Sequence, residues 1–260
     1  MNQKHDYIAV FDSGVGGISV LRHLLRVLPG ERFLYFGDST NAPYGSRTTE
    51  EVRQLTLAAA KKLTSEYGLK ALVIACNTAT GMAVDGLRQQ YPDIPIIGVE
   101  PAVKPAAEQH PGGRVLVLAT PLCLKGQRFH ELHDRFRDQA EIIPVPCGGL
   151  MEFVEHGVLE GPVLRNYLKE KLAPWMEQRV DAAVLGCTHY PFLRNAIAEV
   201  LGAETDIIDG NAGITAQLQR RMTELGLRNP SETPGTVTFY NSLDNPEILE
   251  LSKTLLELPD

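Results

Sequence analysis

The sequence predicts an α/β protein with two pseudosymmetric domains, each built on a mainly parallel sheet with flanking helices. The first reason is that short, continuously apolar runs alternate with longer amphipathic stretches. Strands of a parallel sheet are buried on both faces and form such runs, whereas helices carry apolar residues at intervals of three and four. The second reason is that one strand-and-turn pattern occurs twice. A chain of 260 residues has room for one or two such domains.

The predicted strands are the apolar runs that turn residues bound on both sides. They cover Tyr7–Phe11, Phe33–Phe36, Ala71–Ala75, Ile94–Val99, Arg114–Leu118, Glu141–Val145, Ala182–Leu185, Asp206–Ile208 and Thr236–Tyr240. Helices are predicted between nearly all of them, most clearly at Gly16–Leu28, Glu50–Glu66, Gly161–Gln178 and Gly213–Leu225. The second of these helices is expected to begin near Thr48 or Thr49.

The repeated pattern indicates an internal duplication. Leu72–Thr78 resembles Ala183–His189, and each segment ends an apolar run at a cysteine followed by a polar turn. Ile8–Ser13 precedes the first copy at nearly the spacing by which Val115–Thr120 precedes the second. We therefore expect one domain from residues 1–98 plus 209–260, and a second from residues 99–208.

Charge and composition argue against several classes of partner. The formal net charge is −7 and no basic run exceeds two residues, which does not favour nucleic acid. No apolar stretch approaches the roughly 20 residues that span a bilayer, and residues 1–6 do not resemble a signal peptide. The four cysteines show no paired spacing, so neither a disulfide framework nor a structural metal site is predicted. We expect a cytoplasmic protein that does not bind membranes.

Cys76 and Cys187 are the strongest candidates for chemistry. Each ends a predicted strand just before a helix, and ligands of parallel sheets bind at the carboxyl ends of strands. A helix N-terminus offers unpaired N–H groups, which we expect to lower the thiol pKa and to attract a carboxylate. The alternative is that both are small buried apolar residues, an interpretation we accept for Cys123 and Cys147.

Polar residues beside the two cysteines add candidate roles. Asn77, Thr78 and Thr188 supply side-chain donors. Asp12 ends the first strand and is expected to face the cleft, holding an ammonium group or orienting a thiol; its alternative role is a helix N-cap. His189 is a candidate proton partner, or else a buried, hydrogen-bonded histidine.

Two loops are candidates for binding. The turn Asp12–Gly17 is rich in glycine and lets a ligand approach the backbone, but its spacing fits neither G-x-G-x-x-G nor a P-loop. Pro43-Tyr44-Gly45 lies on a polar loop after the second strand, where binding loops occur, although an ordinary turn is the alternative. Sequence alone favours a surface helix carboxylate for Glu155.

Five ordered motifs together resemble the glutamate racemases over nearly the whole chain. They are Phe11–Gly17, Gly37-Asp38 with Pro43-Tyr44-Gly45, Cys76–Ala79, Gly98–Pro101 and Gly186–Pro191. The segment Cys147–Glu155 departs from the pattern of many relatives. The resemblance implies two α/β domains with the active site between them, and no pyridoxal phosphate, metal or nucleotide. It also implies interconversion of L- and D-glutamate, which supplies D-glutamate for peptidoglycan and cell-wall biogenesis.

The resemblance further implies a role for each candidate residue. Cys76 would take the α-proton from D-glutamate, assisted by Asp12, and Cys187 from L-glutamate, assisted by His189. Glu155 joins the catalytic candidates. The substrate-binding candidates are Asp12, Ser13, Pro43, Tyr44, Gly45, Asn77, Thr78, Thr188 and His189. Ser13, Tyr44 and Gly45 would receive the side-chain carboxylate, and we expect a homodimer.

Three other functions remain open from the sequence. The chain could act on a related substrate, as aspartate and hydantoin racemases or arylmalonate decarboxylases do. It could be a regulator of DNA gyrase, although we expect no activator control because only residues 1–6 precede the first strand. It could also be a thiol-based redox or metal protein.

Overall fold

The computed structural model describes residues 6–231 and 233–259. Their strands form two sheets, with the orders β4-β3-β1-β2-β9 and β6-β5-β7-β8, and all neighbouring strands in them are parallel. The first sheet contains β1 (Tyr7–Asp12), β2 (Phe33–Gly37), β3 (Leu69–Ile74), β4 (Ile96–Gly98) and β9 (Val237–Asn241). The second contains β5 (Arg114–Ala119), β6 (Glu141–Pro146), β7 (Ala182–Leu185) and β8 (Asp206–Asp209).

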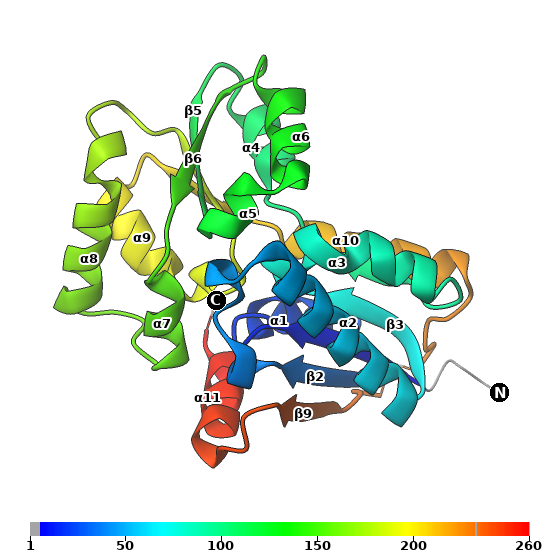
Figure 1. Ribbon diagram of the computed structural model, residues 1–260. Helices are drawn as coiled ribbons and strands as arrows, with labels where there is room; N and C mark the ends of the chain where they lie inside the picture. The colour runs from blue at the N-terminus through cyan, green and yellow to red at the C-terminus, as the bar shows by residue number, and fades with distance from the viewer. Residues whose placement is uncertain (1–5, 232, 260) are drawn as a thin grey trace.

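Helices cover both faces of each sheet, in two lobes that Figure 1 shows side by side. Around the first sheet lie α1 (Ile18–Val27), α2 (Thr49–Glu66), α3 (Asn77–Gln90), α10 (Asn211–Glu224) and α11 (Pro246–Glu257). Around the second lie α4 (Val103–Gln109), α5 (Pro121–Lys125), α6 (Gln127–Phe136), α7 (Leu150–Glu155), α8 (Pro162–Leu172) and α9 (Arg194–Leu201). The predicted α/β fold with parallel sheets is confirmed.

The core follows from the alternation of side chains along the strands. In β1, Ile8 and Val10 face the helices α1, α10 and α11, whereas Ala9 and Phe11 face α2 and α3. The cluster on the first of these faces continues without a break into the second sheet, where it includes Leu118. The two lobes therefore share one apolar core across their junction.

Local sequence explains where several elements begin and end. Thr48 caps α2 in a reciprocal capping box with Glu51, as the predicted helix start requires. The helix predicted over Gly161–Gln178 ends early, at Leu172, because Pro174 cannot continue it and a 3₁₀ turn follows. On the edge strand β6, Pro144 and Pro146 lack the N–H groups that a further strand would pair with.

The return of the chain to the first sheet bears on the domain boundaries. β8 is the last strand of the second sheet, α10 then packs against α1, and β9 pairs with β2. This path supports our proposal that residues 1–98 plus 209–260 form one domain and residues 99–208 the other. No helix among the described residues is long and apolar enough to cross a membrane.

A buried ion pair fastens the base of the first sheet. Lys70 of β3 donates to Glu31, and both side chains are almost wholly excluded from solvent. Glu31 also accepts the Asn229 main-chain N–H at 2.8 Å, which ties the segment before β9 to the turn before β2. Burying two charges is tolerated because they satisfy each other and a neighbouring donor.

We expect Lys70→Met to lower the free energy of unfolding by about 3–5 kcal/mol, because it leaves the Glu31 carboxylate buried without its cation. Chemical denaturation measures the change. Lys104→Met is the matched control, because Lys104 is 63% exposed and its pair with Glu108 is a surface pair. Equal losses of unfolding free energy in the two variants would show that the buried ion pair stabilises the protein no more than a surface pair does.

Candidate active site

Side chains from the carboxyl ends of both sheets meet at the junction between the lobes. Thr188, after β7, donates its hydroxyl to Asp12 Oδ1 at the end of β1, with an O–O distance of 3.0 Å. Thr78, at the start of α3, and Thr120, after β5, lie 3.0 Å apart at their hydroxyl oxygens. Ser19 of α1 donates to the Thr188 carbonyl oxygen at 2.9 Å. The structure thus brings the predicted site residues of both halves together.

Cys76 is buried in the first lobe, with polar groups beside its sulfur. Its sulfur accepts the Ala79 N–H at the start of α3 and lies 3.5 Å from the Ser13 hydroxyl oxygen. Burial raises the pKa of this thiol to about 12, and the nearby Asp12 carboxylate adds to the rise. The contacts with Ser13 and Ala79 lower the pKa without offsetting burial. Our prediction of a lowered pKa was wrong for Cys76, because loss of solvent outweighs the helix N-terminus.

Cys187 belongs to a chain of hydrogen-bonded groups. Its sulfur lies 3.7 Å from Nδ1 of His189, and Nε2 of His189 lies 2.7 Å from Glu155 Oε1. Burial lowers the pKa of His189, but the hydrogen bonds and charges of Cys187 and Glu155 raise it well above the ordinary value. The imidazole thus lies between the Cys187 sulfur and the Glu155 carboxylate, and both contacts favour its charged form.

Glu155 is not the surface helix carboxylate that the sequence alone favoured. It ends α7 with a side chain only 13% exposed, and it accepts the Val15 N–H at 2.9 Å as well as His189. Burial raises the pKa of Glu155, but the hydrogen bond and charge of His189 and the Val15 N–H lower it overall. The short helix α7 points its end at the junction, which no periodicity in the sequence reveals.

Asp12 is held in place by donors from both lobes. Besides the Thr188 hydroxyl, it accepts the Gly14 N–H at 3.1 Å. Its alternative role as a helix N-cap was wrong, because α1 begins after Gly17 and has no side-chain cap. Burial raises the pKa of Asp12, while the His189 charge and the two hydrogen bonds oppose that rise.

The glycine-rich turn leaves room for two side chains of the second lobe. A Cβ atom at Gly14 would lie 1.9 Å from Glu155 Oε1, and one at Gly16 would lie 2.3 Å from His189 Nδ1. Real Cβ atoms do not come so close to their neighbours, so the turn needs glycine for this contact. We interpreted the turn as a place where a ligand approaches the backbone; in the structure, protein side chains take that space.

The loop after β2 is tied to the same junction. Tyr44 is buried and donates its hydroxyl to Asp38 Oδ2 at 2.6 Å, while the Asp38 N–H donates to the Asp12 carbonyl oxygen at 2.9 Å. Burial is the main cause that raises the pKa of the Tyr44 hydroxyl, and the hydrogen bond and charge of Asp38 raise it further. The hydroxyl therefore stays protonated. Pro43 follows a cis peptide bond, and a Cβ at Gly45 would lie 2.8 Å from Thr120 Cβ.

Comparison with known proteins identifies the family. A family model described as Asp/Glu/Hydantoin racemase matches residues 9–218. The chain belongs to the Asp/Glu/hydantoin racemase family. It is accordingly an enzyme, a racemase.

Relatives of this racemase agree with the match. It is 48% identical to the glutamate racemase of Clostridium perfringens (strain ATCC 13124), over 98% of each chain. A glutamate racemase from Francisella tularensis, solved with D-glutamate, is 28% identical with a TM-score of 0.85, over 98% of this chain and 95% of that one. The Escherichia coli glutamate racemase, solved with L-glutamate and the activator UDP-MurNAc-Ala, is 31% identical with a TM-score of 0.84, over 96% and 94%.

Two residues at the junction were not among the candidates from the sequence. Thr120 contacts Gly45 and Thr78 across the junction, and Asp38 holds the Tyr44 hydroxyl. A signal for Thr120 was present in the duplication, because it follows β5 as Ser13 follows β1. For Asp38 the signal was its place just after a strand, where polar side chains reach the carboxyl edge of the sheet.

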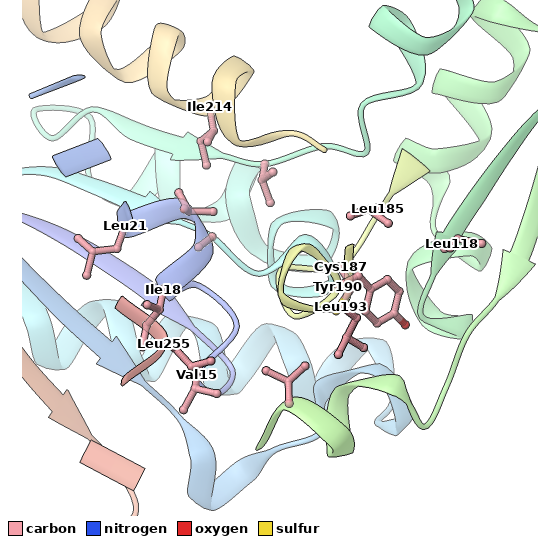
Figure 2. Packing of buried hydrophobic residues seen from close by; sticks show 14 of the residues in the cluster. Val15, Ile18, Leu21, Leu118, Leu185, Cys187, Tyr190, Leu193, Ile214 and Leu255 are labelled. Atoms are coloured by element: carbon pink, nitrogen blue, oxygen red, sulfur yellow. The ribbon is translucent and has the colours of Figure 1, made fainter. Parts of the chain in front are cut away.

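The junction is closed around the thiols. Beside Cys187 and Asn77 there is a cavity of about 10 Å³, and beside Asn77 and Cys123 one of about 20 Å³. Each holds about one water molecule. No group of three or more His, Cys, Asp or Glu side chains that could hold a metal ion occurs among residues 6–231 and 233–259. Figure 2 shows Cys187 grouped with Tyr190 and Leu193 within the shared apolar core, which helps to exclude water.

We expect Gly16→Ala to lower the free energy of unfolding by about 2–4 kcal/mol, because the new methyl group would displace His189. Gly86→Ala is the matched control: Gly86 lies within α3 with nothing near its Cβ position, so alanine should stabilise by about 0.5–1 kcal/mol. Denaturant titration compares the two. A neutral Gly16→Ala would contradict the tight contact between the turn and His189.

Proposed function

We propose that this racemase interconverts L- and D-glutamate by two-base proton transfer at the α-carbon, without a cofactor. The observation that carries the proposal is the placement of two buried thiols, one at the carboxyl edge of each sheet, beside a junction that hydrogen bonds close from both sides. The identity of 48% to a glutamate racemase over nearly the whole chain supports glutamate as the substrate.

Racemisation explains why two thiols are needed. The α-proton leaves one face of the carbon and another proton arrives on the opposite face. A single side chain cannot easily reach both faces, whereas Cys76 and Cys187 approach the junction from opposite lobes. In each direction one sulfur acts as thiolate base and the other as thiol acid, with the order reversed for the reverse reaction. We assign Cys76 to D-glutamate and Cys187 to L-glutamate.

The partners of the two thiols suit these roles. Asp12 lies near Cys76, and a carboxylate there can hold the substrate ammonium group. The arriving ammonium would offset the negative charge of Asp12, which is one of the causes of the raised pKa of Cys76. On the other side, His189 faces the Cys187 sulfur and is itself oriented by Glu155. We therefore assign Asp12, His189 and Glu155 to proton transfer.

Carbanion formation requires donors aimed at the α-carboxylate and exclusion of water. Asn77, Thr78 and Thr188 are buried at the junction, and the first N–H groups of α3 lie beside Asn77 and Thr78. We assign these groups to the α-carboxylate.

Ser13 and the loop Pro43-Tyr44-Gly45 are assigned to the side-chain carboxylate. Because the Tyr44 hydroxyl already donates to Asp38, the main chain of this loop is the part available to the substrate.

The cellular role follows from the product. We propose that the enzyme works in the cytoplasm, as a homodimer, and supplies D-glutamate for peptidoglycan and hence for cell-wall biogenesis and cell shape. The similarity to bacterial glutamate racemases supports this role. An aspartate racemase is the nearest competing function, and an assay of L-aspartate beside L-glutamate by circular dichroism distinguishes the two.

We expect Cys76→Ser and Cys187→Ser each to reduce racemisation by at least about a thousandfold, because a hydroxyl is a far weaker acid than a thiol. Circular dichroism follows L- and D-glutamate in separate assays. Cys123→Ala is the control, since Cys123 packs against apolar residues of α4 and α6 and should leave turnover nearly intact. Near-normal turnover in either serine variant would refute the two-base mechanism.

We expect Glu155→Gln to lower the pKa of His189, because the carboxylate is one of the groups that raise it. Charged His189 stabilises the native state fully below its unfolded pKa, and this contribution is lost as the pH rises through the folded pKa. In Glu155→Gln that loss should begin at lower pH. Histidine NMR titration, with His189→Gln for assignment, measures the shift; Glu152→Gln is the control, because Glu152 is on the exposed side of α7. An unchanged His189 titration in Glu155→Gln would contradict the pairing.

A further inference from the structure

One cavity between the lobes adjoins the loop that we assign to the substrate. Its volume is about 350 Å³, and its lining includes Gly45 from the first lobe and Thr120, Met151 and Tyr190 from the second. Gly45 and Thr120 contact each other, and Thr120 is hydrogen-bonded to Thr78 in the first turn of α3. The wall of this cavity is therefore hydrogen-bonded to the first turn of α3, the helix whose N-cap is Cys76.

The substrate needs a route by which it can reach the two thiols. The small cavities beside Asn77, one next to Cys187 and the other next to Cys123, have room for about one water molecule each, which is far less than a molecule of glutamate occupies. Glutamate must therefore arrive through an opening between the lobes. The chain as a whole carries a net charge of −7, and glutamate at neutral pH carries one net negative charge, so the bulk of the surface repels it.

The lining of the 350 Å³ cavity includes two cationic side chains, Arg47 and Lys125, and one acidic side chain, Glu152. Arg47 is anchored: its Nε donates to the Asn41 carbonyl oxygen at 2.7 Å, and its pair with Glu51 is long, at 3.9 Å. Lys125 is exposed at the end of α5, and its side chain has no hydrogen bond or ion pair with any other residue that the structure describes. Its charge is thus available to an approaching carboxylate.

A larger groove of about 1060 Å³ offers a weaker alternative. It lies between α1 and α9 and is lined by none of the catalytic or substrate-binding candidates. Two of its arginines already have acidic partners: Arg165 lies 3.1 Å from Glu199, and Arg194 pairs with Asp209 at 2.5 Å. Compensated cations attract a further anion less than an unpaired one does.

We propose that Lys125, with Arg47, forms a cationic mouth through which glutamate reaches the thiols. This inference rests on the proposed function. The two cations attract the carboxylates of glutamate to a cavity whose wall includes the substrate loop, and thereby raise the rate of productive encounter. They do not touch the reacting atoms, so they act on kcat/KM and leave kcat unchanged.

Lys125→Gln should lower kcat/KM for glutamate roughly two- to fivefold at low ionic strength, and Lys125→Glu roughly five- to twentyfold. Both losses should shrink at about 0.5 M salt, where surface charges are screened. Lys125→Arg should restore the wild-type value, since it keeps the charge. Lys104→Gln, which removes an exposed lysine on α4, is the matched control and should have no effect.

Several results would overturn the cationic mouth. They are an unchanged kcat/KM in Lys125→Glu, a loss that salt does not reduce, and a loss confined to kcat. A salt-dependent loss in Arg165→Gln instead of Lys125→Gln would transfer the role to the larger groove. If the wild-type protein turns over glutamate, these results concern the mouth alone, whereas a wild-type protein inactive on glutamate would overturn the proposed function and the mouth together.

Discussion

The contact between the glycine-rich turn and the Glu155–His189 pair holds the junction of the two sheets together. Val15 donates its main-chain N–H to Glu155, and the glycines at positions 14 and 16 leave room for the Glu155 and His189 side chains. Val15 and His189 are buried and the Glu155 side chain is only 13% exposed, so separating them would leave polar atoms without partners at a cost of about 1–3 kcal/mol each. Both thiols lie beside this contact. Cys76 is within hydrogen-bond reach of Ser13 in the glycine-rich turn, and Cys187 is within hydrogen-bond reach of His189.

Burial at this junction makes the two thiols electrostatically unlike. Cys76 has a carboxylate and a hydroxyl for neighbours, and its pKa rises to about 12. Cys187 faces His189, whose pKa is raised by its contacts with Cys187 and Glu155. A pseudosymmetric fold therefore supplies two matching positions, while each position has polar neighbours of its own.

Most of the fold could be predicted from the sequence because its signals are local. The nine predicted strands are all present, and Pro174 explains the one long helix that ends early. The strand-end positions of Asp12, Cys76 and Cys187 could also be predicted from the sequence, since parallel strands end at a common edge. What could not be predicted was the environment at that edge. The direction of the Cys76 pKa shift, the burial of Glu155 and the use of the glycine turn all depend on what the other lobe places there.

The sequence by itself determined the parallel α/β architecture, the duplication and the two cysteines, because apolar periodicity and turn residues act over a few positions along the chain. Only the tertiary structure decided which polar groups meet. Asp12 bonds to Thr188 and Val15 to Glu155 across separations of 176 and 140 residues. Such contacts leave no local pattern, and the desolvation that sets their pKa values exists only once the two lobes have closed on each other.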